Sequence, residues 1–175
     1  MALTKTPICD FGKKAENFKL KSTDNKIISL NDIKGEKGTL IMFICNHCPY
    51  VKAIIKDLVQ DCKSLEKFGI NSAAICSNDV KNYPEDSFEN MITFSKENNF
   101  SFPYLHDETQ EVAKVYDAVC TPDFFAYNRN LELQYRGRIK QLKDLQPIDT
   151  GESELFKALK LISKTGEGPK EQHPS

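Results

Sequence analysis

The sequence has no long apolar run, and its charges nearly cancel. Its longest apolar stretch, LIMFI at residues 40–44, has the length of a strand, so we expect no membrane-spanning segment and no membrane partner. The first 18 residues contain no signal-peptide core, which favours a cytoplasmic location over secretion. The formal net charge is −1, and Lys and Arg do not gather in one stretch, which argues against nucleic acid as a partner.

Residue patterns for a disulfide framework or a closed zinc site are also missing. The chain has six cysteines, which a reducing compartment would keep as thiols. Its single C-x-x-C comprises Cys45 and Cys48, and its three histidines form no paired motif, whereas a structural zinc site needs four ligands. We therefore expect a redox-active C-x-x-C, with metal binding as the alternative, and we expect no cofactor.

What the sequence does contain is a regular alternation of strand-like and helix-like segments. Its 175 residues suit one domain with a full core. Apolar periodicity and turn residues predict, in order, a hairpin at 17–35, a strand at 39–44, a helix at 51–68, a strand at 70–77, a helix at 84–99, a strand at 100–105, a helix at 107–117 capped by Asp107, a hairpin at 123–139 and a helix at 153–164. This order indicates an α/β fold with parallel strands and an antiparallel edge. We expect one domain over 1–164 and a flexible tail over 165–175, which has no apolar anchor.

The C-x-x-C lies in FICNHCPY (43–50), where the buried strand gives way to the longest helix. The free N–H groups of a helix N-terminus stabilise a thiolate, so we predict a lowered pKa for Cys45. Cys48 lies about one turn further on, within reach for a disulfide. Two readings stay open for His47: its imidazole stabilises the Cys45 thiolate, or it is an exposed spacer.

A second informative stretch is AVCTPDFF (118–125). Pro122 interrupts an otherwise apolar strand, so it needs a strand start, an edge or an irregular turn. Cys120, two residues earlier, is either a small buried residue or a third redox thiol, and both readings stay open. Cys62 and Cys76 lie in apolar patterns and are expected in the core, whereas Cys9 is expected to be an ordinary thiol of the N-terminal arm.

With these stretches in view, the chain resembles the thioredoxin-fold superfamily. In particular, CNHCPYVK and CTPDFF resemble peroxiredoxin-like proteins related to alkyl hydroperoxide reductase C and thiol-specific antioxidant. The resemblance implies a thioredoxin-like fold: a central mixed sheet flanked by helices, with an N-terminal β-hairpin extension and an inserted helix. It further implies that Cys45 is the nucleophile and Cys48 the resolving cysteine. Pro122 would be the cis-proline facing them, and the backbone of Thr121 would hold an incoming peptide or thiol.

Some positions depart from the patterns of these relatives. The peroxiredoxin pattern Pro-x-x-x-Thr-x-x-Cys is absent around both cysteines of the motif. The Trp and the buried acid that precede the first cysteine in thioredoxins are replaced by Ile44 and Thr39. The buried acid assists proton transfer from the resolving cysteine, so its replacement argues against efficient thioredoxin-like reduction, as the missing peroxiredoxin pattern argues against a peroxidase mechanism of that type.

The leading hypothesis is a thiol–disulfide oxidoreductase that cycles Cys45 and Cys48 between dithiol and disulfide. It would act on protein or small-molecule thiols and disulfides, in redox homeostasis or antioxidant defence. One alternative is reduction of hydroperoxides by Cys45 through a sulfenic acid. The other is a metal-binding thioredoxin-fold protein.

Overall fold

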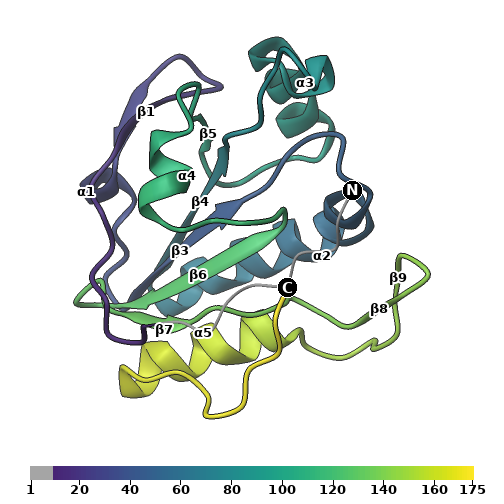
Figure 1. The fold of residues 1–175 in the computed structure, drawn as a ribbon. Coiled ribbons are helices and arrows are strands. Elements are labelled where there is room, and N and C mark those ends of the chain that lie inside the picture. Colours follow the sequence, from purple (N-terminus) through teal and green to yellow (C-terminus); the bar gives the residue numbers. More distant parts are fainter. Residues whose placement is uncertain (1–9) are drawn as a thin grey trace.

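The computed structural model describes residues 10–175, so Cys9 lies outside the described residues. A seven-stranded mixed sheet forms the centre of the molecule, in the order β2-β1-β5-β4-β3-β6-β7 (Figure 1). Its strands are β1 (Lys19–Ser22), β2 (Ile27–Ser29), β3 (Gly38–Phe43), β4 (Ile70–Cys76), β5 (Tyr104–His106), β6 (Asp123–Asn128) and β7 (Leu133–Tyr135). A separate ribbon pairs β8 (Leu142–Lys143) with β9 (Gln146–Pro147).

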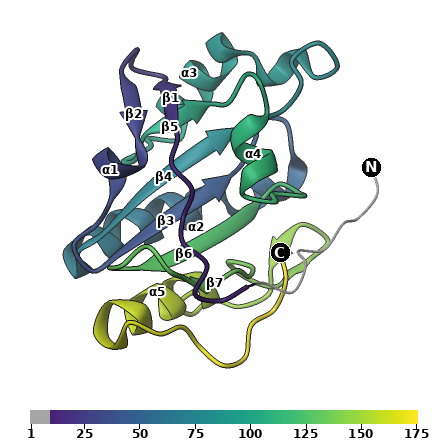
Figure 2. The same ribbon diagram turned by 60° about the vertical axis from the view of Figure 1, so that its left-hand side comes forward.

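Helices cover both faces of this sheet. They are α1 (Leu30–Ile33), α2 (Pro49–Leu65), α3 (Phe88–Glu97), α4 (Glu111–Val115) and α5 (Glu154–Thr165), with short 3-10 turns at Glu66–Phe68 and Pro84–Asp86. Helices α2 and α5 pack on one face, whereas α1 and α4 lie on the other (Figures 1 and 2). In the described part of the chain, no helix is both long and apolar enough to cross a membrane.

Strand β3 is buried along its whole length because a strand pairs with it on each side and both of its faces are covered. It runs parallel to β4 and antiparallel to β6. Successive side chains of a strand point to opposite faces. Accordingly, Leu40 and Met42 pack in the cluster beneath α2 and α5, whereas Ile41 and Phe43 pack in the cluster beneath α1 and α4. The apolar side chains of β3 thus contribute to the hydrophobic cores on both faces of the sheet.

Helix α2 begins a few residues after the carboxyl end of β3. Cys48 is its N-cap residue and Pro49 its first helical residue, a position that needs no backbone donor. The buried face of α2 follows the predicted period: Val51, Ile54, Ile55, Leu58, Cys62 and Leu65. A 3-10 turn extends the helix, and Gly69 ends it with a φ of 73°, a conformation that favours glycine.

Most predicted elements are present, with local differences. The helix predicted to start at Asp107 begins later, with Gln110 as N-cap residue. The Asp107 carboxylate nevertheless accepts from the N–H groups of Val112 and Ala113, so it does cap the helix. The second strand of the late hairpin starts after Leu131, whose φ of 58° takes it out of the extended conformation. The β8–β9 ribbon was not predicted.

The last residues run back beside β7. The N–H of Arg136 donates to Gln172 Oε1 at 3.0 Å, and Gln172 Nε2 donates to the Gln134 carbonyl at 2.9 Å. The N–H of Arg138 donates to the carbonyl of His173 at 2.8 Å. The contacts of this segment are therefore mostly polar. Its division from the domain at residue 165 stays a prediction.

Candidate active site

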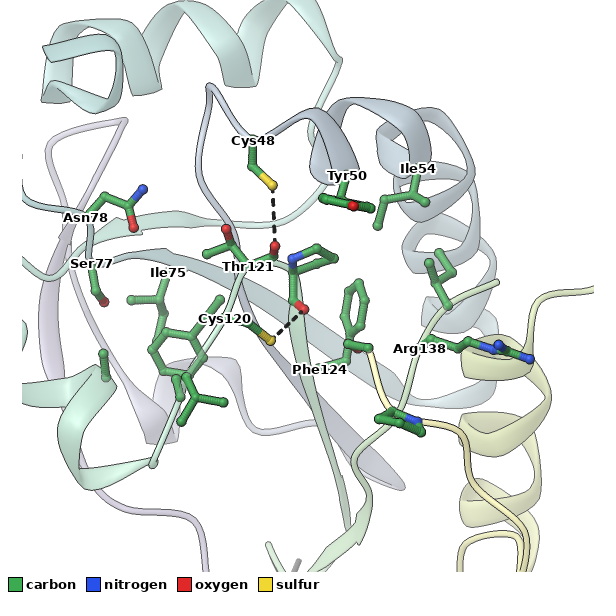
Figure 3. Close-up of a pocket in the computed structure, with 18 of the residues that line it drawn as sticks. Cys48, Tyr50, Ile54, Ile75, Ser77, Asn78, Cys120, Thr121, Phe124 and Arg138 are labelled. Atoms are coloured by element: carbon green, nitrogen blue, oxygen red, sulfur yellow. Dashed lines mark hydrogen bonds between the residues drawn. The ribbon is translucent and has the colours of Figure 1, made fainter. Parts of the chain in front are cut away.

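Two buried thiols meet the loop before β6 at the carboxyl edge of the sheet. Cys45 follows β3, and Cys48 caps α2. Cys45 Sγ is hydrogen bonded to the Thr121 hydroxyl at 3.4 Å, and Cys48 in its thiol form donates to the Thr121 carbonyl at 3.3 Å (Figure 3). The Thr121–Pro122 peptide bond is cis, as the resemblance implies. One residue therefore contacts both sulfurs of the C-x-x-C.

A cavity of about 1000 Å³ opens beside this loop. Its wall includes Cys48, Cys120, Thr121 and Pro122, whereas Cys45 does not line it. The remaining wall is largely apolar, with Phe43, Ile54, Ile75, Phe124, Ile139 and Leu142 among its residues. A substrate in the cavity would therefore meet Cys48 before Cys45.

The two thiols have opposite electrostatic surroundings. The Cys45 thiol donates to the Cys48 sulfur, which lowers the pKa of Cys48 to about 5. The backbone N–H groups of Val51 and Tyr50, in the first turn of α2, also lower the pKa of Cys48, although the Cys48 side chain makes no capping hydrogen bond, whereas burial raises it. The same hydrogen bond, then burial and the negative charge of Asp86, raise the pKa of Cys45. The pKa of Cys45 is thus shifted in the direction opposite to the prediction, chiefly by its interaction with Cys48 and by burial.

A fully buried carboxylate lies beside this motif, on the turn that precedes α3. Asp86 accepts at Oδ1 from the N–H groups of Asn46 (2.8 Å) and His47 (3.3 Å). At Oδ2 it accepts from Asn78 Nδ2 (2.7 Å) and from His47 Nδ1 (2.6 Å). Three of these four donors are amide groups that can only donate, so the arrangement suits an ionised carboxylate. Asp86 thereby holds the backbone between the two cysteines.

His47 is fixed by more than this one bond. Its ring stacks on that of Tyr83, with 4.9 Å between centroids and 11° between planes. Because Nδ1–H donates to Asp86, the neutral ring carries its lone pair on Nε2. That atom is buried and has no hydrogen-bond partner among the described residues. His47 is therefore an ordered part of the site and not a spacer exposed to solvent.

The metal alternative can be tested against the same geometry. Ligand atoms of Cys45, His47 and Asp86 lie within 4.8 Å of one another. However, both oxygens of Asp86 and Nδ1 of His47 are already engaged with each other and with amides. A structural zinc site also needs four ligands. This arrangement suits a hydrogen-bonded proton-transfer group better than a metal site.

The structure brings all the residues of the sequence hypothesis to one place. Cys45, Cys48, His47, Cys120, Thr121 and Pro122 gather at the edge of the sheet. Cys120 Sγ lies 3.6 Å from the Pro122 carbonyl, and burial raises the pKa of the Cys120 thiol to about 12. Its role as a third redox thiol stays a prediction. The residue that sequence reasoning missed is Asp86, which lies in the segment YPEDS at 83–87.

A thioredoxin-like sheet with two thiols facing a cis-proline defines a thiol-based redox protein of the thioredoxin fold. More particularly, residues 11–142 match the AhpC/TSA family, and the chain belongs to this family. The resemblance inferred from CNHCPYVK and CTPDFF is thereby confirmed.

Solved structures agree with this assignment. The chain is 41% identical to an uncharacterized conserved protein from Geobacillus kaustophilus, with a TM-score of 0.94 over 100% of this chain and 93% of that one. It is 31% identical to a hypothetical protein from Sinorhizobium meliloti, with a TM-score of 0.90 over 98% and 94%. The thioredoxin domain of a thiol-disulfide oxidoreductase from Bacteroides vulgatus shares the fold at 16% identity, with a TM-score of 0.62 over 74% and 89%. A search of curated proteins finds no match.

Proposed function

We propose that the protein is a thiol–disulfide oxidoreductase in which Cys48 attacks and Cys45 resolves. The observation that carries this proposal is the placement of Cys48, which lies at the N-cap position of α2 beside the first-turn amides and lines the cavity. This order of the two cysteines is the reverse of the one that the resemblance implies. We infer this order from the electrostatic surroundings of each sulfur and not from the position of each cysteine in the motif.

The proposed cycle needs no cofactor. The Cys48 thiolate attacks a substrate disulfide, an S–S bond forms between Cys48 and one half of the substrate, and the other half leaves as a thiolate that takes a proton from water. Cys45 then loses its proton and attacks Cys48 Sγ, which releases the second thiol and leaves a Cys45–Cys48 disulfide. Two electrons pass from the dithiol to the substrate. In reverse, the disulfide oxidises a partner dithiol. Protein or small-molecule thiols and disulfides are thus the proposed partners, in redox homeostasis.

Trapping of the mixed disulfide tests the order of attack. With the aromatic disulfide DTNB, Cys45→Ser is expected to accumulate an adduct on Cys48, whereas Cys48→Ser should form none at a comparable rate. Peptide mapping by mass spectrometry identifies the modified cysteine. Rates of alkylation of Cys45→Ser against pH should rise from acid with a midpoint well below the free-thiol value of about 8.5. Rapid adduct formation on Cys45 in Cys48→Ser would contradict the proposal.

Peroxide reduction is a second candidate, favoured by the family and by the low pKa of Cys48 in a cavity wall. Attack of the Cys48 thiolate on a hydroperoxide would give a sulfenic acid and release the alcohol or water. Cys45 would then condense with the sulfenic acid to form the disulfide and release water. Consumption of hydroperoxide with a dithiol reductant, lost in Cys48→Ser, supports this activity. Disulfide exchange without peroxide consumption restricts the protein to the first function.

A further inference from the structure

Asp86 and His47 form a buried pair for which the proposed cycle has so far given no role. Asp86 has an exposed fraction of 0%, and among residues 10–175 its hydrogen-bond partners include no Lys or Arg. Amide dipoles and the His47 ring surround its negative charge. The ring in turn keeps one nitrogen, Nε2, without a hydrogen-bond partner in the described part of the chain. Such a carboxylate–imidazole pair is suited to accepting and returning a proton.

The group in need of such a pair is the Cys45 thiol. Its exposed fraction is 1%, and its pKa is raised, so at neutral pH it attacks only if a neighbour removes its proton. The Cys45 sulfur, one ring nitrogen of His47 and one carboxylate oxygen of Asp86 lie within 4.8 Å of one another, so the thiol lies within one water molecule of the His47–Asp86 pair. Thr39, which stands where thioredoxins carry a buried acid, instead accepts from the N–H of Gly35 at 3.0 Å. Asp86 therefore supplies a carboxylate from another part of the chain.

We propose that His47, positioned by Asp86, accepts the proton of the Cys45 thiol as Cys45 attacks the mixed disulfide on Cys48. The Cys45–H bond breaks, its proton passes to Nε2, the Cys45–Cys48 bond forms, and the bond from Cys48 to the substrate sulfur breaks. The leaving thiolate then takes a proton, which restores the neutral ring. In the reverse direction, His47 returns the proton to Cys45. This inference rests on the proposed function, because it concerns the resolving step alone.

The other titratable groups around the pair leave this assignment intact. They are Cys48 from α2, Cys76 from β4, Tyr104 from β5, and Tyr83 and Glu85 from the turn that carries Asp86. Burial raises the pKa of Cys76 to about 11 and that of Tyr104 well above its usual value, so neither titrates near neutrality. Tyr104 donates to Asn46 Oδ1 at 2.9 Å and acts there as a neutral donor.

DTNB separates the two chemical steps by stopped-flow absorbance. Attack by Cys48 releases a first thionitrobenzoate, and attack by Cys45 releases a second, whose departure needs no proton. In His47→Ala and Asp86→Asn we expect the first phase to change less than about threefold. The second phase should slow by about 100-fold at pH 7, at the low end of general-base effects. Added imidazole should restore the second phase in His47→Ala.

The matched control is Asp107→Asn, which alters a buried carboxylate that caps α4. It should lower stability and leave both phases intact. A second phase that stays fast in His47→Ala, or one that slows without regaining speed in imidazole, overturns the inference. His47→Ala keeps the test decisive even if Asp86→Asn fails to fold. Absence of a second phase in the unaltered protein would instead overturn the proposed function.

Discussion

Two fully buried aspartates flank the dithiol, and their charges are balanced in different ways. Asp86 is held by amides and an imidazole, as described above. Asp123, the first residue of β6, accepts from Arg136 through Nε at 3.2 Å and Nη2 at 2.8 Å. Burial raises the pKa of Asp123, and the guanidinium of Arg136 opposes that rise. One carboxylate thus has a permanent cation, whereas the other has a neighbour that can gain and lose a proton.

The surroundings of Arg136 explain why the Asp123 pair serves structure. The guanidinium also donates to the Asp117 carbonyl at 2.7 Å and lies 4.4 Å from the centroid of the Phe125 ring. It therefore ties together both ends of the loop that carries Thr121 to the dithiol. A carboxylate that accepts two hydrogen bonds from a guanidinium keeps its protonation state, whereas a carboxylate beside an imidazole and a thiol can take part in proton transfer.

The largest expected effect comes from breaking the structural pair. Arg136→Met leaves Asp123 buried without its cation, and such a change costs about 3–5 kcal/mol of unfolding free energy. Urea denaturation measures this loss. The double variant Asp123→Asn with Arg136→Met removes the stranded charge and should be more stable than Arg136→Met. If Arg136→Met lost less than about 1 kcal/mol, well below that range, the structural role assigned to Asp123 would be refuted.

A smaller loss of stability is expected from Asp86→Asn. The variant keeps the shape of the side chain, but its amide nitrogen cannot accept, so the donors on one oxygen lose their acceptor and those on the other bond to an uncharged one. Hydrogen bonds to a charged acceptor are worth about 1.5–3 kcal/mol each. Because the partners of Asp86 among the described residues include amides and no Lys or Arg, the substitution leaves no buried charge unpaired. We therefore expect the free energy of unfolding to fall by about 1–2 kcal/mol, measured in the same urea titration. The contrast between Asp86 and Asp123 is strengthened if Asp86→Asn is more stable than Arg136→Met and yet has the slower resolving step. It fails if both variants lose stability and activity in the same proportion.

The segment from β3 to α2 could be predicted from local pattern. A strand buried on two faces has a continuous apolar run, and a helix has apolar residues at the helical period. The cis form of Pro122 followed from the family resemblance and not from local pattern. The β8–β9 ribbon did not follow, since its strands are two residues long and carry no alternation. Asp86 reaches the loop of the cysteines from 40 residues away, and its arrival depends on how the turn before α3 packs.

The order of the two thiols also lay beyond the sequence. The start of α2 was predicted within two residues, but the sequence does not show how each sulfur lies relative to the first-turn amides. That question is decided by backbone geometry over three or four residues. Cys48 lies at the N-cap position beside the amides, and Cys45 lies in the field of Asp86.

The place of Cys48 at the first turn of α2 also bears on the reduction potential of the pair. The N–H groups of Tyr50 and Val51 stabilise an anion that exists only in the reduced state. When the disulfide forms, that anion disappears and the helix loses its partner. The reduced state is favoured accordingly, which moves the potential upward from that of two ordinary thiols. In the proposed cycle, the first turn of α2 would thus bias the Cys45–Cys48 pair toward taking electrons from partner thiols.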